Sequence, residues 1–152
     1  MTEQTSINAM AILSSPEDRV RLREIFLHSG WCLDLSECLN DARAIFQKAH
    51  IGVVVTDWRL PDGGWRDVLD ELERRHMPPP PVIVVSRLAD ERLWAEVLNL
   101  CGYDVLATPF HAEEVRWSIS SAWRHWQNKC AIGTHGPRTG KPQSLSTQTE
   151  RM

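Results

Sequence analysis

The sequence predicts an α/β fold, a doubly wound five-stranded parallel sheet of order 2-1-3-4-5 with helices on both faces. Short β-branched runs alternate with segments of helical spacing, which is the rhythm of five βα units. The segments "VVVTD" and "VIVVS" are apolar on both faces, as parallel strands covered by helices must be. A chain of 152 residues, 42% of them hydrophobic, is long enough for one domain with a core and too short for two ordinary ones.

Strands and helices follow one another in order along the chain. The first helix has a clear start, because Ser15 can cap it and Pro16 suits its first position, and Gly30 marks its end. The third helix ends before Pro78, the first of four consecutive prolines that cannot continue a helix. The predicted strands are residues 7–13, 31–36, 51–57, 82–86 and 104–108, and the helices are 15–30, 39–50, a segment around 68–72, 90–101 and 111–126.

The domain is expected to span residues 1–126, with a flexible, disordered tail over 127–152. The tail is rich in Gly, Ser, Thr and Gln and has no periodicity. It carries four Lys/Arg and one Asp/Glu, a charge of +3, which leaves −6 on the body of a chain whose net charge is −3. The acidic balance argues against a protein that binds nucleic acid by neutralising phosphates.

Cysteine usage and hydropathy indicate the compartment. The four cysteines lie far apart with no C-x-x-C pair, which fits reduced, mostly buried thiols better than a disulfide framework or a zinc site. No apolar run approaches the length of a membrane span, and the N-terminus lacks a basic-then-apolar signal segment. We therefore expect a cytoplasmic protein with no direct contact to nucleic acid or membrane.

Polar residues follow the ends of several predicted strands. In open α/β sheets ligands bind at the carboxyl ends of the strands, which places Ser14, Asp57, Ser86 and Thr108 around one rim. Asp57 is notable because it ends a buried, β-branched run. Two interpretations stay open: Asp57 does chemistry there, or it accepts hydrogen bonds from the "PDGG" turn that follows.

Residues of about 7–126 resemble the receiver domain of bacterial two-component response regulators. The resemblance rests on "VVVTDWRLPDGG", "VIVVS" and "GYDVLATPF" in this order, each at the expected strand end. It implies a flavodoxin-like receiver fold with Asp57 as the phosphoacceptor and Ser86 as the hydroxyl that senses the phosphoryl group.

The sequence departs from that family at most other polar positions. Ser14 and Ser15 stand where receivers have two acidic residues that help to hold Mg²⁺, and Thr108 replaces the family lysine. Two unit charges about 4 Å apart attract by roughly 4 kcal/mol at an effective dielectric of 20, so losing two such partners weakens metal binding by orders of magnitude. With Asp57 as its one carboxylate, the Mg²⁺ site is expected to be weak or absent. Glu17 or Asp18 can in principle lean into the site, but the first helical turn favours acids for its own sake.

An apolar surface is predicted on the last two helices. Trp94 and Leu98 form one stripe of the fourth helix, and Trp117 lies opposite the core-facing Val115 on the fifth. Receivers use this face for dimers and outputs, and their aromatic switch residue on the intervening strand is replaced here by Val105. The resemblance therefore implies an interface for a partner protein or a homodimer, formed by Trp94, Leu98, Val105 and Trp117.

Together these features favour a single-domain response-regulator-like signalling protein of a phosphorelay, with a degenerate phosphorylation site and no attached output domain. It acts by protein contact and is not an enzyme beyond slow autodephosphorylation. Two alternatives stay open: a competent receiver phosphorylated on Asp57 by a histidine kinase, and a constitutive dimerisation or scaffold module.

Overall fold

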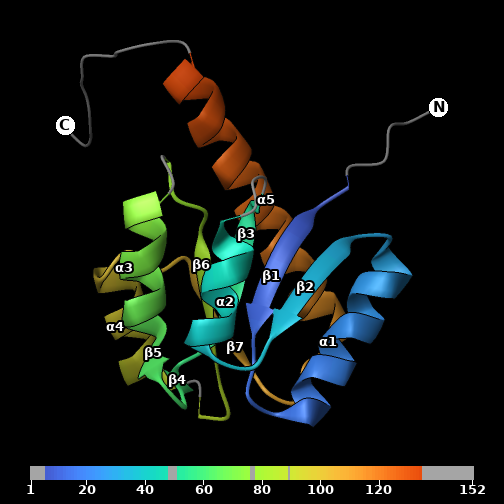
Figure 1. Cartoon of the computed structure of the whole chain (residues 1–152). Helices are drawn as coiled ribbons and strands as arrows, with labels where there is room; N and C mark the ends of the chain where they lie inside the picture. The colour runs from blue at the N-terminus through green and yellow to red at the C-terminus, as the bar shows by residue number, and fades with distance from the viewer. Residues whose placement is uncertain (1–5, 48–50, 76–77, 89, 135–152) are drawn as a thin grey trace.

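The computed structural model describes residues 6–47, 51–75, 78–88 and 90–134 (Figure 1). Its main sheet has five strands whose neighbours all pair in parallel. They are β1 (Asn8–Ile12), β2 (Cys32–Ser36), β3 (Val53–Asp57), β6 (Val82–Ser86) and β7 (Asp104–Ala107). The order β2-β1-β3-β6-β7 is the predicted 2-1-3-4-5 when these strands are counted along the chain, so the predicted fold class is confirmed.

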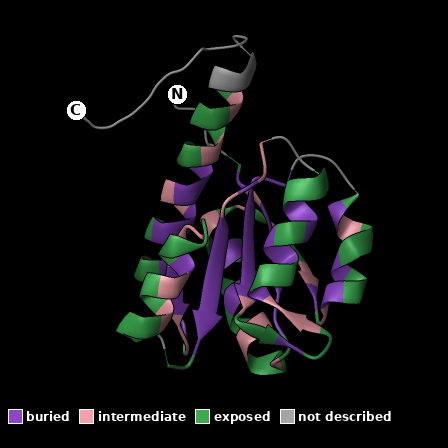
Figure 2. Ribbon diagram, turned by 90° about the vertical axis from the view of Figure 1, so that its left-hand side faces the viewer, coloured by how far each residue is buried: buried purple, intermediate pink, exposed green. Residues whose placement is uncertain are grey.

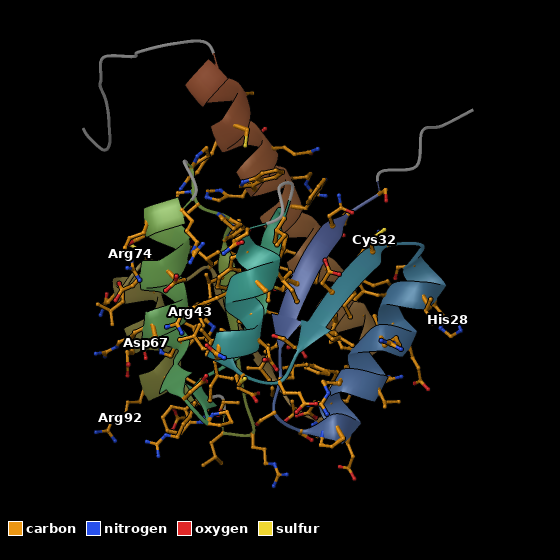
Figure 3. The ribbon with its side chains drawn as sticks, viewed as in Figure 1. His28, Cys32, Arg43, Asp67, Arg74 and Arg92 are labelled. Carbon is orange, nitrogen blue, oxygen red and sulfur yellow. The ribbon has the colours of Figure 1, made fainter. Side chains whose placement is uncertain are left out.

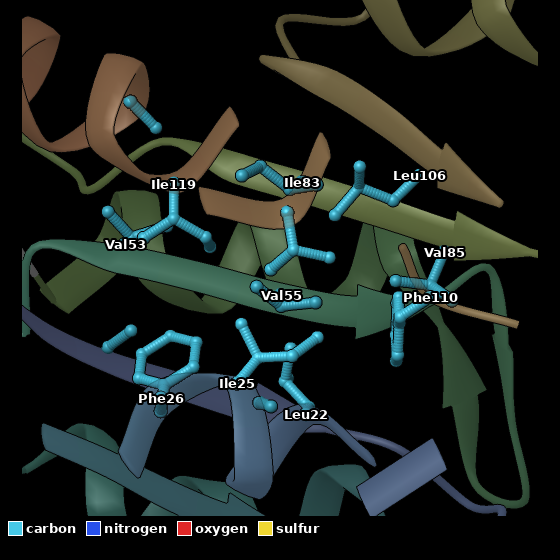
Figure 4. Close-up of a cluster of buried hydrophobic side chains, with 14 of the residues drawn as sticks. Leu22, Ile25, Phe26, Val53, Val55, Ile83, Val85, Leu106, Phe110 and Ile119 are labelled. Atoms are coloured by element: carbon cyan, nitrogen blue, oxygen red, sulfur yellow. The ribbon is translucent and has the colours of Figure 1, made fainter. Parts of the chain in front are cut away.

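Five helices cover the two faces of this sheet. They are α1 (Pro16–Ser29), α2 (Leu39–Phe46), α3 (Trp65–Arg75), α4 (Glu91–Asn99) and α5 (Ala112–Thr134). Helices α1 and α5 pack on one face, where Phe26, Val55 and Ile119 share a buried cluster (Figure 4). Helices α2, α3 and α4 pack on the other face around Phe46, Leu72 and Val97 (Figure 1). Burial of these apolar side chains on both faces accounts for the near-continuous apolar strands.

The first helix begins and ends as its sequence predicts. The Ser15 hydroxyl accepts a hydrogen bond from the Asp18 backbone N–H at 3.5 Å. Gly30 ends the helix with φ 74°, a left-handed conformation that glycine adopts without steric cost. The chain between Leu13 and α1 is thereby fixed at the edge of the sheet where β1 and β3 end.

The structure departs from the sequence prediction in two elements. A small antiparallel hairpin, β4 (Arg59–Leu60) with β5 (Gly63–Gly64), follows β3 and was not predicted, because its strands are too short for any periodicity. Helix α5 continues past Trp126 to Thr134, since residues 127–132 contain no glycine or proline that would break it. The helical part of the predicted tail therefore ends at 134, and residues 135–152 lie outside the described residues.

The cysteines are free, as expected, but they are not buried. Cys32 and Cys101 are exposed, while Cys38 and Cys130 are half-buried. Cys32 lies on the sheet-edge strand β2, and Cys101 lies in the loop after α4 with φ 75°. Among the described residues, no helix combines the length and the apolar content that a membrane crossing requires.

Helix α5 approaches the start of β3 very closely. A methyl group built on Gly52 would overlap the Trp123 ring and come within 2.8 Å of the Trp126 ring. The two indole rings also contact each other, with centroids 5.3 Å apart. Only glycine fits under this pair, so Gly52 sets the distance between α5 and the sheet.

We therefore predict that Gly52→Ala lowers the free energy of unfolding by about 1–3 kcal/mol, the usual cost of overpacking a close-packed site. Chemical denaturation monitored by circular dichroism would measure it. Adding Trp123→Leu should recover part of the loss, because the smaller side chain makes room for the methyl group. An unchanged midpoint for Gly52→Ala would contradict the close approach.

Candidate functional site

A cavity of about 640 Å³ opens at the carboxyl ends of the strands. It brings together the four rim residues predicted from the sequence, which come from segments far apart in the chain. Its wall also contains residues from the loops after β3 and β6 and from the first turns of α1 and α4. The lining residues include Ser14, Ser15, Asp18, Asp57, Trp58, Arg59, Ser86, Arg87, Leu88, Arg92 and Thr108.

Asp57 is held at the floor of this cavity by Ser14. The Ser14 backbone N–H and hydroxyl both donate to Asp57 Oδ2, at 2.9 and 3.0 Å. The other carboxylate oxygen, Oδ1, has no hydrogen bond to any residue in the described ranges. One oxygen is thus oriented by the end of β1, and the other remains available to a ligand or a reacting group.

The turn after Asp57 does not supply these hydrogen bonds. Its carboxylate, Asp62, instead accepts from the backbone N–H groups of Leu39 and Asn40, both at 2.8 Å, and so caps α2. Burial acts to raise the pKa of Asp62, but these backbone hydrogen bonds outweigh it and the pKa lies below its usual value. The expectation that Asp57 accepts hydrogen bonds from the turn is therefore wrong. Asp57 accepts them from Ser14, just after β1, and Asp62 caps α2.

The other predicted rim residues are mostly engaged in local structure. The Ser15 hydroxyl caps α1 rather than contacting Asp57. The Ser86 hydroxyl is buried and accepts from the Leu88 backbone N–H at 3.1 Å. The Thr108 backbone N–H donates to the Ser86 carbonyl at 3.3 Å, and the Thr108–Pro109 peptide bond is cis. Ser86 and Thr108 thus offer this rim neutral hydroxyl groups and no charge.

Asp18 lines the cavity with Asp57, although the sequence favoured a role for it in the first helical turn alone. Burial raises the pKa of Asp18 first, the charge of Asp57 raises it further, and the charge of Arg87 opposes them. The two carboxylates therefore lie within electrostatic reach of each other. In the sequence, the cap at Ser15 could have predicted the position of Asp18, because it fixes residue 18 on the helical turn that starts just after the end of β1.

The donor set fits a divalent cation only in part. Asp18 and Asp57 are two carboxylates in one cavity, and Mg²⁺ accepts one or two carboxylates together with water. Within the described ranges, no group of three or more His, Cys, Asp or Glu residues is arranged to hold a metal ion. The Ser14 hydroxyl and backbone N–H already donate hydrogen bonds to Asp57 Oδ2, the carboxylate oxygen on the side of β1.

Sequence reasoning missed the arginines of this cavity. Arg59, Arg87 and Arg92 all line it, and Arg59 lies over the Trp58 ring with its guanidinium carbon 4.6 Å from the centroid. Trp58 is 44% exposed, so it forms part of the cavity wall without closing it. No pattern in the sequence distinguishes these arginines, because Arg59 stands in the two-residue strand β4, Arg87 in a loop and Arg92 at the start of α4.

The predicted interface residues separate into two groups. Trp94, Leu98 and Trp117 are exposed, at 48%, 42% and 69%, and lie on helices that flank the edge strand β7. Val105, in contrast, is 7% exposed and packs into the core with Val97, because its side chain points to the helix-covered face of β7. We call Trp94, Leu98 and Trp117 the α4–α5 surface; Val105 is not part of it.

Two curated bacterial regulators are similar to this chain. It is 29% identical to the regulatory protein AtoC of Escherichia coli K12 over 123 residues, which cover 78% of this chain and 26% of AtoC. It is 26% identical to the response regulator PilR of Pseudomonas aeruginosa over 86 residues, 57% of this chain and 19% of PilR. The chain therefore spans about a quarter or less of the length of these relatives.

Solved receiver domains share the fold. A receiver domain of an HD-domain-containing protein from Pseudomonas fluorescens Pf-5 matches with a TM-score of 0.74 at 17% identity, covering 86% of this chain and 96% of that one. A beryllofluoride-activated receiver dimer of NtrC4 matches at 0.71 and 20% identity, covering 78% and 98%. The receiver domain of a sensor histidine kinase from Pseudomonas aeruginosa PAO1, with a magnesium ion in its active-site cleft, matches at 0.69 and 16% identity, covering 79% and 99%.

These likenesses agree with a match to a family model over most of the folded part of the chain. Residues 14–120 match the model of the response regulator receiver domain. That range starts at Ser14 beside the carboxylate and includes Asp57, Ser86, Thr108 and the whole α4–α5 surface. The chain belongs to the family of response regulator receiver domains of two-component systems.

Proposed function

We propose that this receiver domain signals through protein contact at the α4–α5 surface and that its metal and phosphorylation site is degenerate. The observation that carries the proposal is the pair of hydrogen bonds from Ser14 to Asp57 Oδ2. This oxygen already accepts hydrogen bonds from a neutral hydroxyl and a backbone N–H. An acidic residue at position 14 would instead place a second negative charge beside Asp57, which a cation would have to neutralise. The free cysteines are consistent with a reducing, cytoplasmic location, which is part of the same proposal.

Phosphoryl transfer to a carboxylate depends on positioning and on neutralising negative charge. In this cavity the family lysine is replaced by Thr108, and the position beside Asp57 is occupied by Ser14. Besides Asp18, the wall contains Asp90 and Glu96, but Asp90 caps α4 and Glu96 pairs with Arg66. A Mg²⁺ ion would therefore have Asp57 and Asp18 as its charged ligands and would rely on water for most of the rest. These donors support a weak Mg²⁺ site.

A competent receiver is the second candidate function. Asp57 Oδ1 is free of hydrogen bonds to described residues and faces an open cavity, so it can act as a nucleophile. With acetyl phosphate, Oδ1 would attack phosphorus, the bond from phosphorus to the acetyl oxygen would break, and acetate would leave with the electron pair. Receiver domains receive phosphoryl groups from histidine kinases or phosphotransfer proteins, and these are the donors that this candidate implies.

We predict that Ser14→Asp raises the affinity for Mg²⁺ at least tenfold, because a second charged ligand replaces the neutral hydroxyl beside Asp57. Titration followed by quenching of the exposed Trp58 would measure the affinity, with Trp58→Phe to identify the signal. Ser15→Asp should change it much less, because residue 15 caps α1. Low-millimolar or tighter binding of Mg²⁺ by the wild type would count against the degenerate site.

We further predict no stable phosphoryl adduct on the wild type after incubation with Mg²⁺ and acetyl phosphate, beyond the level of Asp57→Asn. Intact mass spectrometry in acid would detect it, since an acyl phosphate adds a phosphoryl group to the protein mass. A base-labile adduct on the wild type alone would establish the second candidate and reject the degenerate site.

The α4–α5 surface is proposed to bind a partner protein or a second copy of this chain. Its residues are two tryptophans and a leucine that stay exposed beside an edge strand. Tryptophan is over-represented among the residues that dominate binding energy, whereas a single exposed apolar residue needs no explanation. Some receivers dimerise, and the NtrC4 receiver dimer is one.

We predict that Trp117→Ala weakens self-association about thirtyfold, the effect of losing a hot-spot side chain worth about 2 kcal/mol. Sedimentation velocity over a range of concentrations would measure it. Leu27→Ala is the control, because Leu27 is 70% exposed on α1, away from this surface. A dimer that Trp117→Ala and Trp94→Ala both leave intact would place the interface elsewhere, and one unaffected by Asp57→Ala would favour a constitutive scaffold.

A further inference from the structure

Most carboxylates of the cavity have hydrogen-bond or ion-pair partners, whereas its arginines do not pair with described residues. Three of its carboxylates have partners: Asp57 accepts from Ser14, Asp90 accepts from the Leu93 N–H at 3.0 Å, and Glu96 pairs with Arg66 at 2.7 Å. The guanidinium groups of Arg59, Arg87 and Arg92 form no ion pair or hydrogen bond with a residue in the described ranges. The cavity thus presents unpaired positive charge beside a carboxylate whose negative charge is partly satisfied.

The backbone places Arg87 at the end of β6, in the same cavity wall as Asp57 and Thr108. Arg87 directly follows Ser86, the last residue of β6, and the two residues before it are held by hydrogen bonds from the segments that follow β3 and β7. The Trp58 N–H donates to the Val85 carbonyl at 3.0 Å, and the Thr108 N–H donates to the Ser86 carbonyl at 3.3 Å. Position 87 therefore lies at the sheet edge between the residue after Asp57 and Thr108.

The other two arginines are less suited to a group at Asp57. Arg59 lies over the Trp58 ring, where the cation–π contact holds its guanidinium. Arg92 lies in the first turn of α4, and Figure 3 shows its side chain pointing away from the body of the protein. The charge of Arg87, in contrast, is felt by Asp18, whose carboxyl in turn feels Asp57.

A phosphoryl group at Asp57 would bring close to two negative charges into this cavity. Thr108 meets them with a neutral hydroxyl, and the carboxylates of the wall, Asp18 among them, repel them. A guanidinium group is always protonated and presents a planar fork of donors that matches the oxygens of a phosphate. An exposed arginine at position 87 has the charge, the reach and the free donors for this task.

We infer that Arg87 supplies the positive charge of an oxyanion site over Asp57, so that the cavity binds a phosphate-type dianion without the family lysine. For the identity of its occupant, the inference rests on the second candidate function above, the competent receiver. In this inference Arg87, the residue after Ser86, has the role that the family gives to a lysine at the end of the fifth sheet strand, where this chain has Thr108.

The test uses the Asp57→Asn chain, in which the repelling carboxylate is neutral and no acyl phosphate can form. Inorganic phosphate is added at constant ionic strength, and ¹⁵N–¹H correlation spectra follow the Trp58 indole and the backbone amides of residues 87 and 88. We expect saturable shifts, an affinity lower by about tenfold or more when Arg87→Ala is added, and partial recovery with Arg87→Lys. The same spectra show whether each variant is folded.

Two further variants make the assignment specific. Arg23→Ala in the same background is the matched control, because Arg23 is exposed on α1 and outside the cavity, and it should leave the affinity unchanged. Thr108→Lys should restore binding in the Asp57→Asn, Arg87→Ala chain, since it returns a cation from the neighbouring strand end.

The inference is overturned if phosphate binds Asp57→Asn equally well with and without Arg87, or if it does not bind in a saturable manner at all. Neither result depends on Mg²⁺ affinity, on covalent labelling or on self-association. Failure of the oxyanion site is therefore distinguishable from failure of the proposed signalling function.

Discussion

The parallel register of the sheet is the constraint on which this site depends. Because β1, β3, β6 and β7 all run in one direction, their carboxyl ends meet at a single edge, with Asp57 beside Val85 and Ser86 beside Ala107. Residues more than forty positions apart in the chain thereby share one cavity. The apolar strands contribute by burying the valines of β3 and β6 on both faces of the sheet, which holds these strands at its centre.

Within that frame, the balance of charge at the strand ends decides what the site can do. The hydrogen bonds from Ser14 orient the Asp57 carboxylate, and Thr108 presents a neutral hydroxyl to the same cavity. Asp18 and Arg87 then act in opposite senses, the first favouring a cation and the second an anion. We propose that these two residues, which the family motif does not include, decide which kind of ion the cavity binds.

The sequence was sufficient for the features that repeat or that terminate an element. The strand order, the Ser15 and Gly30 caps of α1 and the gathering of Ser14, Asp57, Ser86 and Thr108 all follow from periodicity and from the rule for parallel sheets. Exposure of Trp117 followed from its angle to Val115 on the helix. Such features depend on local chemistry or on one long-range rule.

Features that depend on how neighbouring segments lie in space were not predictable. The burial of Val105 is set by α4 packing over β7, and the proximity of Asp18 to Asp57 is set by the entry angle of α1. The arginines of the cavity carry no periodic signal, because they stand in a loop, in a two-residue strand and at a helix start. The continuation of α5 was missed because polar composition was taken for disorder, although residues 127–132 are compatible with a helix.

The length of α5 has a mechanical consequence. At about 1.5 Å per residue, its 23 residues extend roughly 34 Å, about twice the length of a five-residue strand, and its far end stands clear of the sheet (Figure 2). It is anchored along its first half, where Ser118 donates to Asp104 at 2.6 Å and Tyr103 contacts Ser121, and at Trp123 over Gly52. The first half of the helix is therefore held against β7 and the start of β3. A rigid tilt of α5 about these contacts would displace its far end by more than its Ala112 end, because the far end lies more residues away from them.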